Sequence, residues 1–495
     1  MKTLGWSKLM FRVLALLWIS LTSLPLPGRE LPPNVPPPEA VSFHMPAVQQ
    51  LPNGLRVVLV ERHDVPIVRL YAIVQIGAEA DPPGLPGTAT MVAGLLPEGT
   101  RHRSAYQIAQ AVDQAGGSID TGAGWDQSYA NVSVLSNHTA LAFDLLADLL
   151  VRPAFAPAEV ERIRRQTLSA LDVVDRDPSY LADMVMRRLL FAGTDYAHSE
   201  DGTRSSVERI TRKDLVDFHE RYYVPSRTIL AVVGDITAPE CLRLASRFLG
   251  GWKNGPAVTP APRSHPSAPR GRQVVVVNKP DAVQTEIRVA NLGVARSSPD
   301  YFALAIANQV LGGPAANRLF DELRTRHGLV YGASSDLDCY ASLGTWVAKT
   351  STRSSETIKA TEMVLAQIAR MRDAPVKHWE LQNARDYLVG NEALQFESAS
   401  QVANQVLEMM LYHLPSDYWT LFPQRVRSLT ADDVLATTRK YLNPEDDVIV
   451  LVGNVAAFKD GLKKLGPVRV VPIADVGRAF AEPEKGTADR PSSAK

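Results

Sequence analysis

The chain has 495 residues and contains one pattern twice, which constrains its fold more than any other feature. Each copy is typical of a capped helix, a proline that stops it and a short apolar strand that ends at glycine. The two copies lie at a constant offset of 219 residues without a gap. The recurring pairs are Thr211 and Thr430, Asp214 and Asp433, Tyr222 and Tyr441, Pro225 and Pro444, and Gly234 and Gly453. A match of this length indicates an internal duplication.

The two halves also share their order of secondary structure: strand-like segments first, long amphipathic helices in the middle and a strand late. We therefore predict an α+β fold of two homologous domains. Each is expected to be a mainly antiparallel sheet packed with long helices, and the two to face each other across a clamshell cleft, where ligands commonly bind. The predicted domains span 48–252 and 273–470, with a linker rich in Pro and Ser at 253–272. A tail, disordered at its end, is expected at 471–495.

The amino terminus is typical of an exported protein. Basic residues precede a short apolar run at 13–19, which is interrupted soon afterwards by Pro25. We interpret residues 1–28 as a secretory signal peptide and 29–47 as a proline-rich linker. The run is too short to predict a stable membrane span, although an uncleaved anchor remains the alternative. The expected location is the periplasm of a Gram-negative host.

Charge and cysteine content exclude several functions. The chain has 53 basic and 53 acidic residues, so there is no electrostatic case for binding nucleic acid or an anionic membrane. The two cysteines, Cys241 and Cys339, match no metal-ligand spacing and make no disulfide framework. Either two separate thiols or a single bridge is compatible with the sequence.

Several motifs resemble the pitrilysin/insulinase family of metallopeptidases over nearly the whole mature chain. In the first half they are LPNGL at 51–55 and the glycine-rich segment GLPGTATMVAGLLPEGT at 84–100. In the second half they are LGG at 311–313, NRLF at 317–320 and LRTRHGLVY at 323–331. The resemblance implies a fold of two related domains and a site for hydrolysing peptides.

At the zinc site this chain departs from the family. Active members carry H-x-x-E-H on a helix, where two histidines four residues apart reach one Zn²⁺ and the Glu acts as general base. A further Glu downstream completes the ligands. The corresponding positions here are Thr90, Ala93 and Gly94, and the downstream position falls on or next to Ala170. None of them can bind zinc or accept a proton, so we expect no metal cofactor on this chain and no activity of the chain alone.

The histidines of this chain give no sign of a metal site elsewhere in the sequence. The chain has ten histidines, and no two of them show the i, i+4 spacing that would place both on one helical face. We expect them to be scattered surface or hydrogen-bonded side chains.

The second half keeps an arginine and a tyrosine, Arg324 and Tyr331, which are seven residues apart. In active family members such a pair reaches toward the zinc and donates hydrogen bonds to the scissile carbonyl. The residues alone would also fit a helix-surface charge and a half-buried strand residue. The first half has Asp113 and Asp120 at the roughly matching place. The resemblance thus implies a non-catalytic subunit of a heteromeric zinc peptidase, which supplies the pair to a zinc-bearing homologous partner acting on extended peptides.

Two other functions remain compatible with this sequence. One is a purely structural role, since core subunits of the mitochondrial respiratory complex resemble the same fold and have lost catalysis. The other is a stand-alone peptide-binding protein of the periplasm. Copurification with a zinc-bearing homologue, with a membrane complex or with bound peptide alone would distinguish the three.

Overall fold

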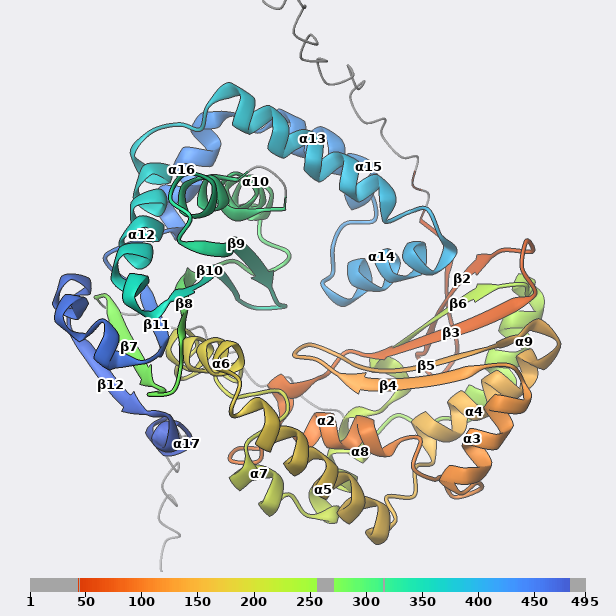
Figure 1. Cartoon of the computed structure of the whole chain (residues 1–495). Coiled ribbons are helices and arrows are strands. Elements are labelled where there is room, and N and C mark those ends of the chain that lie inside the picture. Colours follow the sequence, from red (N-terminus) through yellow and green to blue (C-terminus); the bar gives the residue numbers. More distant parts are fainter. Residues whose placement is uncertain (1–42, 44, 256–270, 315–316, 481–495) are drawn as a thin grey trace, which may run out of the picture. The chain divides into compact units, whose positions relative to one another are not determined.

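The computed structural model describes residues 43, 45–255, 271–314 and 317–480 (Figure 1). The predicted signal peptide and most of both predicted linkers lie outside the described residues. Phe43, at the end of the first linker, is buried, and its ring lies 5.1 Å from that of Phe396. In the part of the chain that is described, no helix combines the length and apolarity that a membrane crossing requires.

The first half forms a six-stranded sheet. Its order is β1 (Val48–Gln50), β2 (Arg56–Glu61), β6 (Thr228–Gly234), β3 (Ile67–Val74), β5 (Ser128–Leu135) and β4 (Ser118–Ala123). The β2–β6 pair is parallel and the others are antiparallel. The helices of this half are α2 (Thr88–Leu95), α3 (Ala105–Gln114), α4 (Thr139–Val151), α5 (Pro157–Val174), α6 (Pro178–Leu190), α7 (Arg204–Arg209), α8 (Arg212–Tyr222) and α9 (Ala238–Leu249).

The second half repeats this sheet. Its order is β12 (Val468–Pro472), β7 (Gln273–Asn278), β11 (Val448–Gly453), β8 (Gln284–Leu292), β10 (Gly344–Arg353) and β9 (Val330–Cys339). Its helices are α10 (Tyr301–Gly312), α11 (Arg318–Phe320), the π-helical turn η4 (Asp321–Arg326), α12 (Thr357–Asp373), α13 (His378–Leu394), α14 (Ala399–Leu411), α15 (Tyr418–Ser428) and α16 (Ala431–Tyr441). Because β2-β6-β3-β5-β4 and β7-β11-β8-β10-β9 correspond strand by strand, the predicted pair of α+β domains is confirmed.

The repeated sequence pattern builds the same local structure in both halves. Thr211 and Asp214 form a capping box at the start of α8, and Thr430 and Asp433 form one at the start of α16. Each box satisfies backbone N–H groups that the first helical turn leaves free. The apolar strands that follow, β6 and β11, are completely buried and central in their sheets.

One helix from each half packs on the sheet of the other half. Helix α6 contacts β8 and β11, and α14 contacts β2 and β6. The apolar side chains of α6 share a core with strand residues such as Val275, Val347 and Val450. Those of α14 share a core with Val58 and Ile229, among others. The two halves are therefore interlocked rather than joined only by their linker.

The second half continues further than the sequence suggests. The tail expected from residue 471 begins inside β12, and α17 (Val476–Ala479) follows. Val476 and Phe480 are buried in the core that contains α6. Residues 481–495 lie outside the described residues. Cys241 and Cys339 are both free, and burial raises the pKa of each thiol to about 12.

Candidate functional site

Helix α2 presents the positions at which active family members carry H-x-x-E-H. Asp81 holds the start of this helix, because its carboxylate accepts the N–H groups of Gly87 at 2.7 Å and Ala89 at 2.8 Å. Gly87 has a φ of 95°, a left-handed conformation that favours glycine. The loop before α2 is thus built to fix where the helix begins.

The side chains at these positions are too small to bind a metal. Thr90 donates its hydroxyl to the backbone carbonyl of Glu200 at 2.8 Å, and Ala93 is completely buried. Gly94 faces open space, because a Cβ atom built on it would meet nothing within 4 Å. Ala170 lies on α5, which contacts α2, and is exposed. The fold keeps the two helices together while the ligands and the base are missing.

No substitute metal site is found in the part of the chain that the structure describes, since no three His, Cys, Asp or Glu side chains are grouped to hold an ion. Glu200, whose backbone carbonyl accepts from Thr90, has an unusual side chain that no sequence motif singles out. Burial raises the pKa of its carboxyl group to about 7, although Arg187, 3.8 Å away, opposes the shift. This carboxyl group is therefore partly protonated at neutral pH.

Arg324 and Tyr331 lie against each other at the beginning of β9. The Arg324 side chain makes two contacts with Tyr331. Its Nη1 donates to the Tyr331 carbonyl, and its guanidinium lies 4.6 Å from the centroid of the Tyr331 ring. The connecting turn reverses at Gly328, whose φ is 59°. Tyr331 is 87% exposed, and it is therefore no half-buried strand residue. The pair thus consists of an exposed phenol and a guanidinium that lies over its ring.

The first half has no such pair. Asp113 lies in the last turn of α3 and Asp120 in β4, and both are exposed. Carboxylates at these places accept hydrogen bonds and would repel a developing oxyanion. The two halves of the fold thus differ in the sign of the charge that they present here.

A cavity of about 1770 Å³ lies beside the Arg324–Tyr331 pair. Its wall includes six consecutive residues of β9, from Tyr331 to Asp336. Because β9 is an edge strand with β10 as its neighbour, it can pair with another chain along this wall. Among the described residues that line the cavity, Ser179 comes from the first half and none comes from α2 or α5. The pair therefore shares no cavity with the degenerate zinc positions of its own chain.

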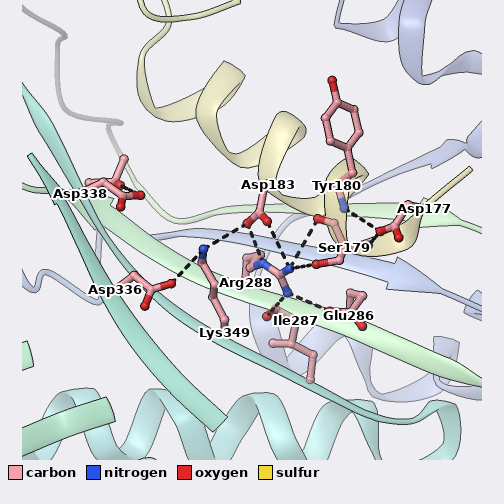
Figure 2. Close-up of polar contacts among 11 residues, drawn as sticks. Asp177, Ser179, Tyr180, Asp183, Glu286, Ile287, Arg288, Asp336, Asp338 and Lys349 are labelled. Atoms are coloured by element: carbon pink, nitrogen blue, oxygen red, sulfur yellow. Dashed lines mark hydrogen bonds and ion pairs between the residues drawn. The ribbon is translucent and has the colours of Figure 1, made fainter. Parts of the chain in front are cut away.

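An ionic cluster around the buried Arg288 joins the halves, and Arg288, Glu286 and Ser179 of this cluster line the cavity (Figure 2). Arg288 on β8 is 3% exposed, and it donates to Asp183 at 2.8 Å, Ser179 Oγ at 2.6 Å and Glu286 at 3.0 Å. Lys349 on β10 lies 3.8 Å from the same Asp183 carboxylate. Burial alone would lower the pKa of Arg288, but the two carboxylates raise it above its ordinary value. We call Arg288, Asp183, Ser179 and Glu286 the latch.

Comparisons with known proteins agree with this fold. A model of Insulinase (Peptidase family M16) matches residues 56–199, and one of the Peptidase M16 inactive domain matches residues 209–388. An uncharacterized zinc protease of Mycobacterium leprae is 31% identical over 331 residues, which cover 64% of this chain and 72% of that protein. The non-peptidase homolog YmxG of Helicobacter pylori is 22% identical over 405 residues, which cover 80% and 91%.

A solved structure supports the same assignment. The crystal structure of a peptidase M16 inactive domain from Pseudomonas fluorescens has a TM-score of 0.77 and 28% identity, and covers 82% of this chain and 97% of that one. The fold and the positions without ligands define a metallopeptidase homologue with a degenerate zinc site. The chain belongs to peptidase family M16, the insulinase family.

Proposed function

We propose that this chain is the non-catalytic subunit of a heteromeric zinc metallopeptidase that acts on extended peptides. Arg324 and Tyr331 serve a zinc ion that is bound by H-x-x-E-H on a homologous partner subunit. One observation carries the proposal: Arg324 contacts Tyr331, which is exposed on β9, whereas the zinc-site positions on α2 and α5 of the same chain offer neither ligand nor base. A device of this kind has a use only where another chain supplies the metal.

The chemistry of the pair is electrostatic stabilisation. The partner's zinc would activate water and polarise the scissile carbonyl. Arg324 and Tyr331 would donate hydrogen bonds to the carbonyl oxygen as it gains negative charge. The hydrogen bond from Arg324 to the Tyr331 carbonyl would hold the guanidinium next to this tyrosine before substrate arrives. Removing one such donor typically costs about 2.7–4 kcal/mol of transition-state stabilisation.

An extended peptide fits the wall beside the pair. The free edge of β9 offers backbone donors and acceptors to a peptide that adds as a further strand. A cavity of about 1770 Å³ exceeds the roughly 300–1,000 Å³ that small-molecule sites occupy. A folded protein would not present its backbone in this way, so we propose unfolded peptide as the substrate class.

The proposal includes export. The amino-terminal pattern at residues 1–28 supports secretion to the periplasm, where the partner would be found. Fractionation of cells that express the full chain should place it in the periplasmic extract. A variant without residues 1–28 should stay in the cytoplasm, and equal distributions of the two would contradict this part of the proposal.

The central experiment mixes the purified chain with a zinc-bearing homologue of the same host and measures kcat/KM on an extended peptide. We expect activity that neither protein shows alone. Arg324→Ala and Tyr331→Phe should each lower kcat/KM by roughly 10²–10³, mostly through kcat.

Matched controls are Arg176→Ala and Tyr106→Phe, which change an exposed arginine and a 74% exposed tyrosine of the first half. These controls should leave the activity unchanged. If the Arg324 and Tyr331 variants are as active as the controls, the role of the pair is wrong. If complex formation persists without any activity, the chain is a scaffold instead.

A further inference from the structure

A second cavity lies between the two halves, and it shares no described lining residue with the first cavity. Its volume is about 640 Å³, within the range of small-molecule sites. Its walls come from β3, β4 and β5 of the first half and from β9 and α14 of the second. Five tyrosines line it: Tyr71, Tyr129, Tyr301, Tyr340 and Tyr412.

The charges on this cavity are unbalanced. Asp120, Asp338 and Glu408 line it, and Arg296 is the one Lys or Arg among its described lining residues. Arg296 is already neutralised, because its Nε donates to Glu408 at 2.7 Å. Asp120 and Asp338 form no ion pair with any described residue; Asp338 accepts only a long 3.4 Å hydrogen bond from a threonine. Two carboxylates therefore face the cavity without a cation.

The aromatic wall already holds one cation. The Arg296 guanidinium lies 4.2 Å from the ring centroid of Tyr301 and 5.0 Å from that of Tyr418. Aromatic faces attract cations through their quadrupole, and more strongly where water is excluded. Four further tyrosines, Tyr71, Tyr129, Tyr340 and Tyr412, also line this cavity.

Nearby carboxylates contribute to the raised pKa of two of these tyrosines. Burial raises the pKa of Tyr129, and the Asp120 carboxylate raises it further. Burial likewise raises the pKa of Tyr340, to which Asp338 adds while Arg187 opposes. Burial opposes a charge of either sign, so only the carboxylate part of these shifts indicates a potential that favours a cation.

We propose that this cavity binds an organic cation, an ammonium or guanidinium group enclosed by tyrosine rings and paired with Asp120 and Asp338. The group could belong to a free amine or to a lysine or arginine side chain of a peptide, since both present the same chemistry. The inference concerns this chain alone and does not depend on a zinc-bearing partner. It remains testable if the proposed subunit role fails.

The first test uses calorimetry on the full chain with a matched pair of probes, choline and its uncharged isostere 3,3-dimethylbutan-1-ol. Shape and apolar surface are nearly equal, so only the charge differs. We expect choline to bind at least tenfold more tightly. The proposal is overturned if the two probes bind equally well. It is also overturned if neither of them binds and the lysine peptide described below does not bind either.

Variants locate the site. Asp120→Asn and Asp338→Asn keep the shape of each side chain and remove its charge, and each should weaken choline binding roughly tenfold. Asp113→Asn, which changes an exposed carboxylate outside the cavity, should have no effect. If all three variants bind choline like the parent chain, the cation binds elsewhere and the assignment is wrong. The comparison of the two probes on the parent chain remains informative even if a variant folds poorly.

A second pair of probes separates the two sources of the cation. Blocked tripeptides Gly-Lys-Gly and Gly-norleucine-Gly differ in one charged group. Each pair of probes gives one ratio of affinities, charged over uncharged. A ratio of at least ten for the two peptides that is also larger than the ratio for choline and its isostere supports a peptide side chain as the ligand. A preference confined to choline supports a free amine.

Discussion

The two halves of this chain share one strand order, yet they join each other by different chemistry. Helix α6 of the first half is fixed to the second sheet by the buried latch around Arg288. Helix α14 of the second half lies on the first sheet with lighter polar contacts: Gln75 donates to the Met410 carbonyl at 3.1 Å, and Arg69 to Ser400 Oγ at 3.3 Å. A duplicated fold can thus keep its topology while its halves specialise.

The same divergence separates the two candidate sites. The first half keeps helices α2 and α5 in contact but has lost every zinc ligand. The second half keeps a guanidinium and a phenol that have no counterpart in the first, where Asp113 and Asp120 stand. The first half therefore keeps only the helices that would support a zinc site, and the second half keeps the hydrogen-bond donors. A two-subunit enzyme would divide the work in the same way.

The largest expected effect comes from restoring ligands to the first half. The triple variant Thr90→His, Gly94→His and Ala170→Glu should bind one zinc per chain with a dissociation constant of about 1 μM or less, roughly 8 kcal/mol. The open space at Gly94 admits the second imidazole. Metal analysis after dialysis would measure it. The parent chain should hold no stoichiometric zinc, and zinc bound tightly to the parent would contradict the whole assignment.

The latch should dominate the stability of the contact between the halves. Arg288→Ala leaves the carboxylates of Asp183 and Glu286 partly buried without their cation, and should lower the free energy of unfolding by roughly 3 kcal/mol. Urea denaturation would measure the loss. Lys349→Ala, which removes a cation 3.8 Å from the same Asp183, is the matched control and should cost about 1 kcal/mol or less. Equal losses for the two variants would show that Arg288 is not special.

Each half also contains a carboxyl group whose pKa is raised mainly by burial: Glu200 in the first, to about 7, and Glu392 in the second, to about 8. Folding favours the protonated form, so this contribution is complete below the ordinary pKa of 4.5 and is lost as pH rises through 7 or 8. Glu200→Gln and Glu392→Gln should each remove this pH-dependent loss in the free energy of unfolding. The loss should be on the order of 2 kcal/mol for each group, because both keep some contact with solvent.

The measurement is the free energy of unfolding between pH 5 and 9. The parent's stability should begin to fall near the ordinary pKa of 4.5 for both groups, and the loss should level off near pH 7 for Glu200 and near pH 8 for Glu392. Glu397→Gln, at an exposed site of the second half, serves as the control and should follow the parent throughout. Parallel curves for all four proteins would show that neither carboxyl group is perturbed.

The smallest effect is expected at the neutral contact of α14. Gln75→Ala removes the hydrogen bond to the Met410 carbonyl and the amide oxygen that accepts from Arg56 within the first half, and should cost about 1 kcal/mol. Thermal unfolding under the conditions used for the Arg288 variant would compare the two contacts directly. A loss as large as that of Arg288→Ala would mean that the two halves are joined symmetrically after all.

The sequence by itself determined the duplication, the α+β class and the positions where ligands are missing. These depend on local patterns, such as the capping boxes at Thr211 and Thr430, and on a family motif read residue by residue. Only the tertiary structure decided that α6 and α14 each pack on the sheet of the other half. It alone also decided the latch and the cavity with Asp120 and Asp338. The physical reason is distance along the chain: Arg288 and Asp183 are 105 residues apart, and neither burial nor charge pairing is visible until the chain has folded.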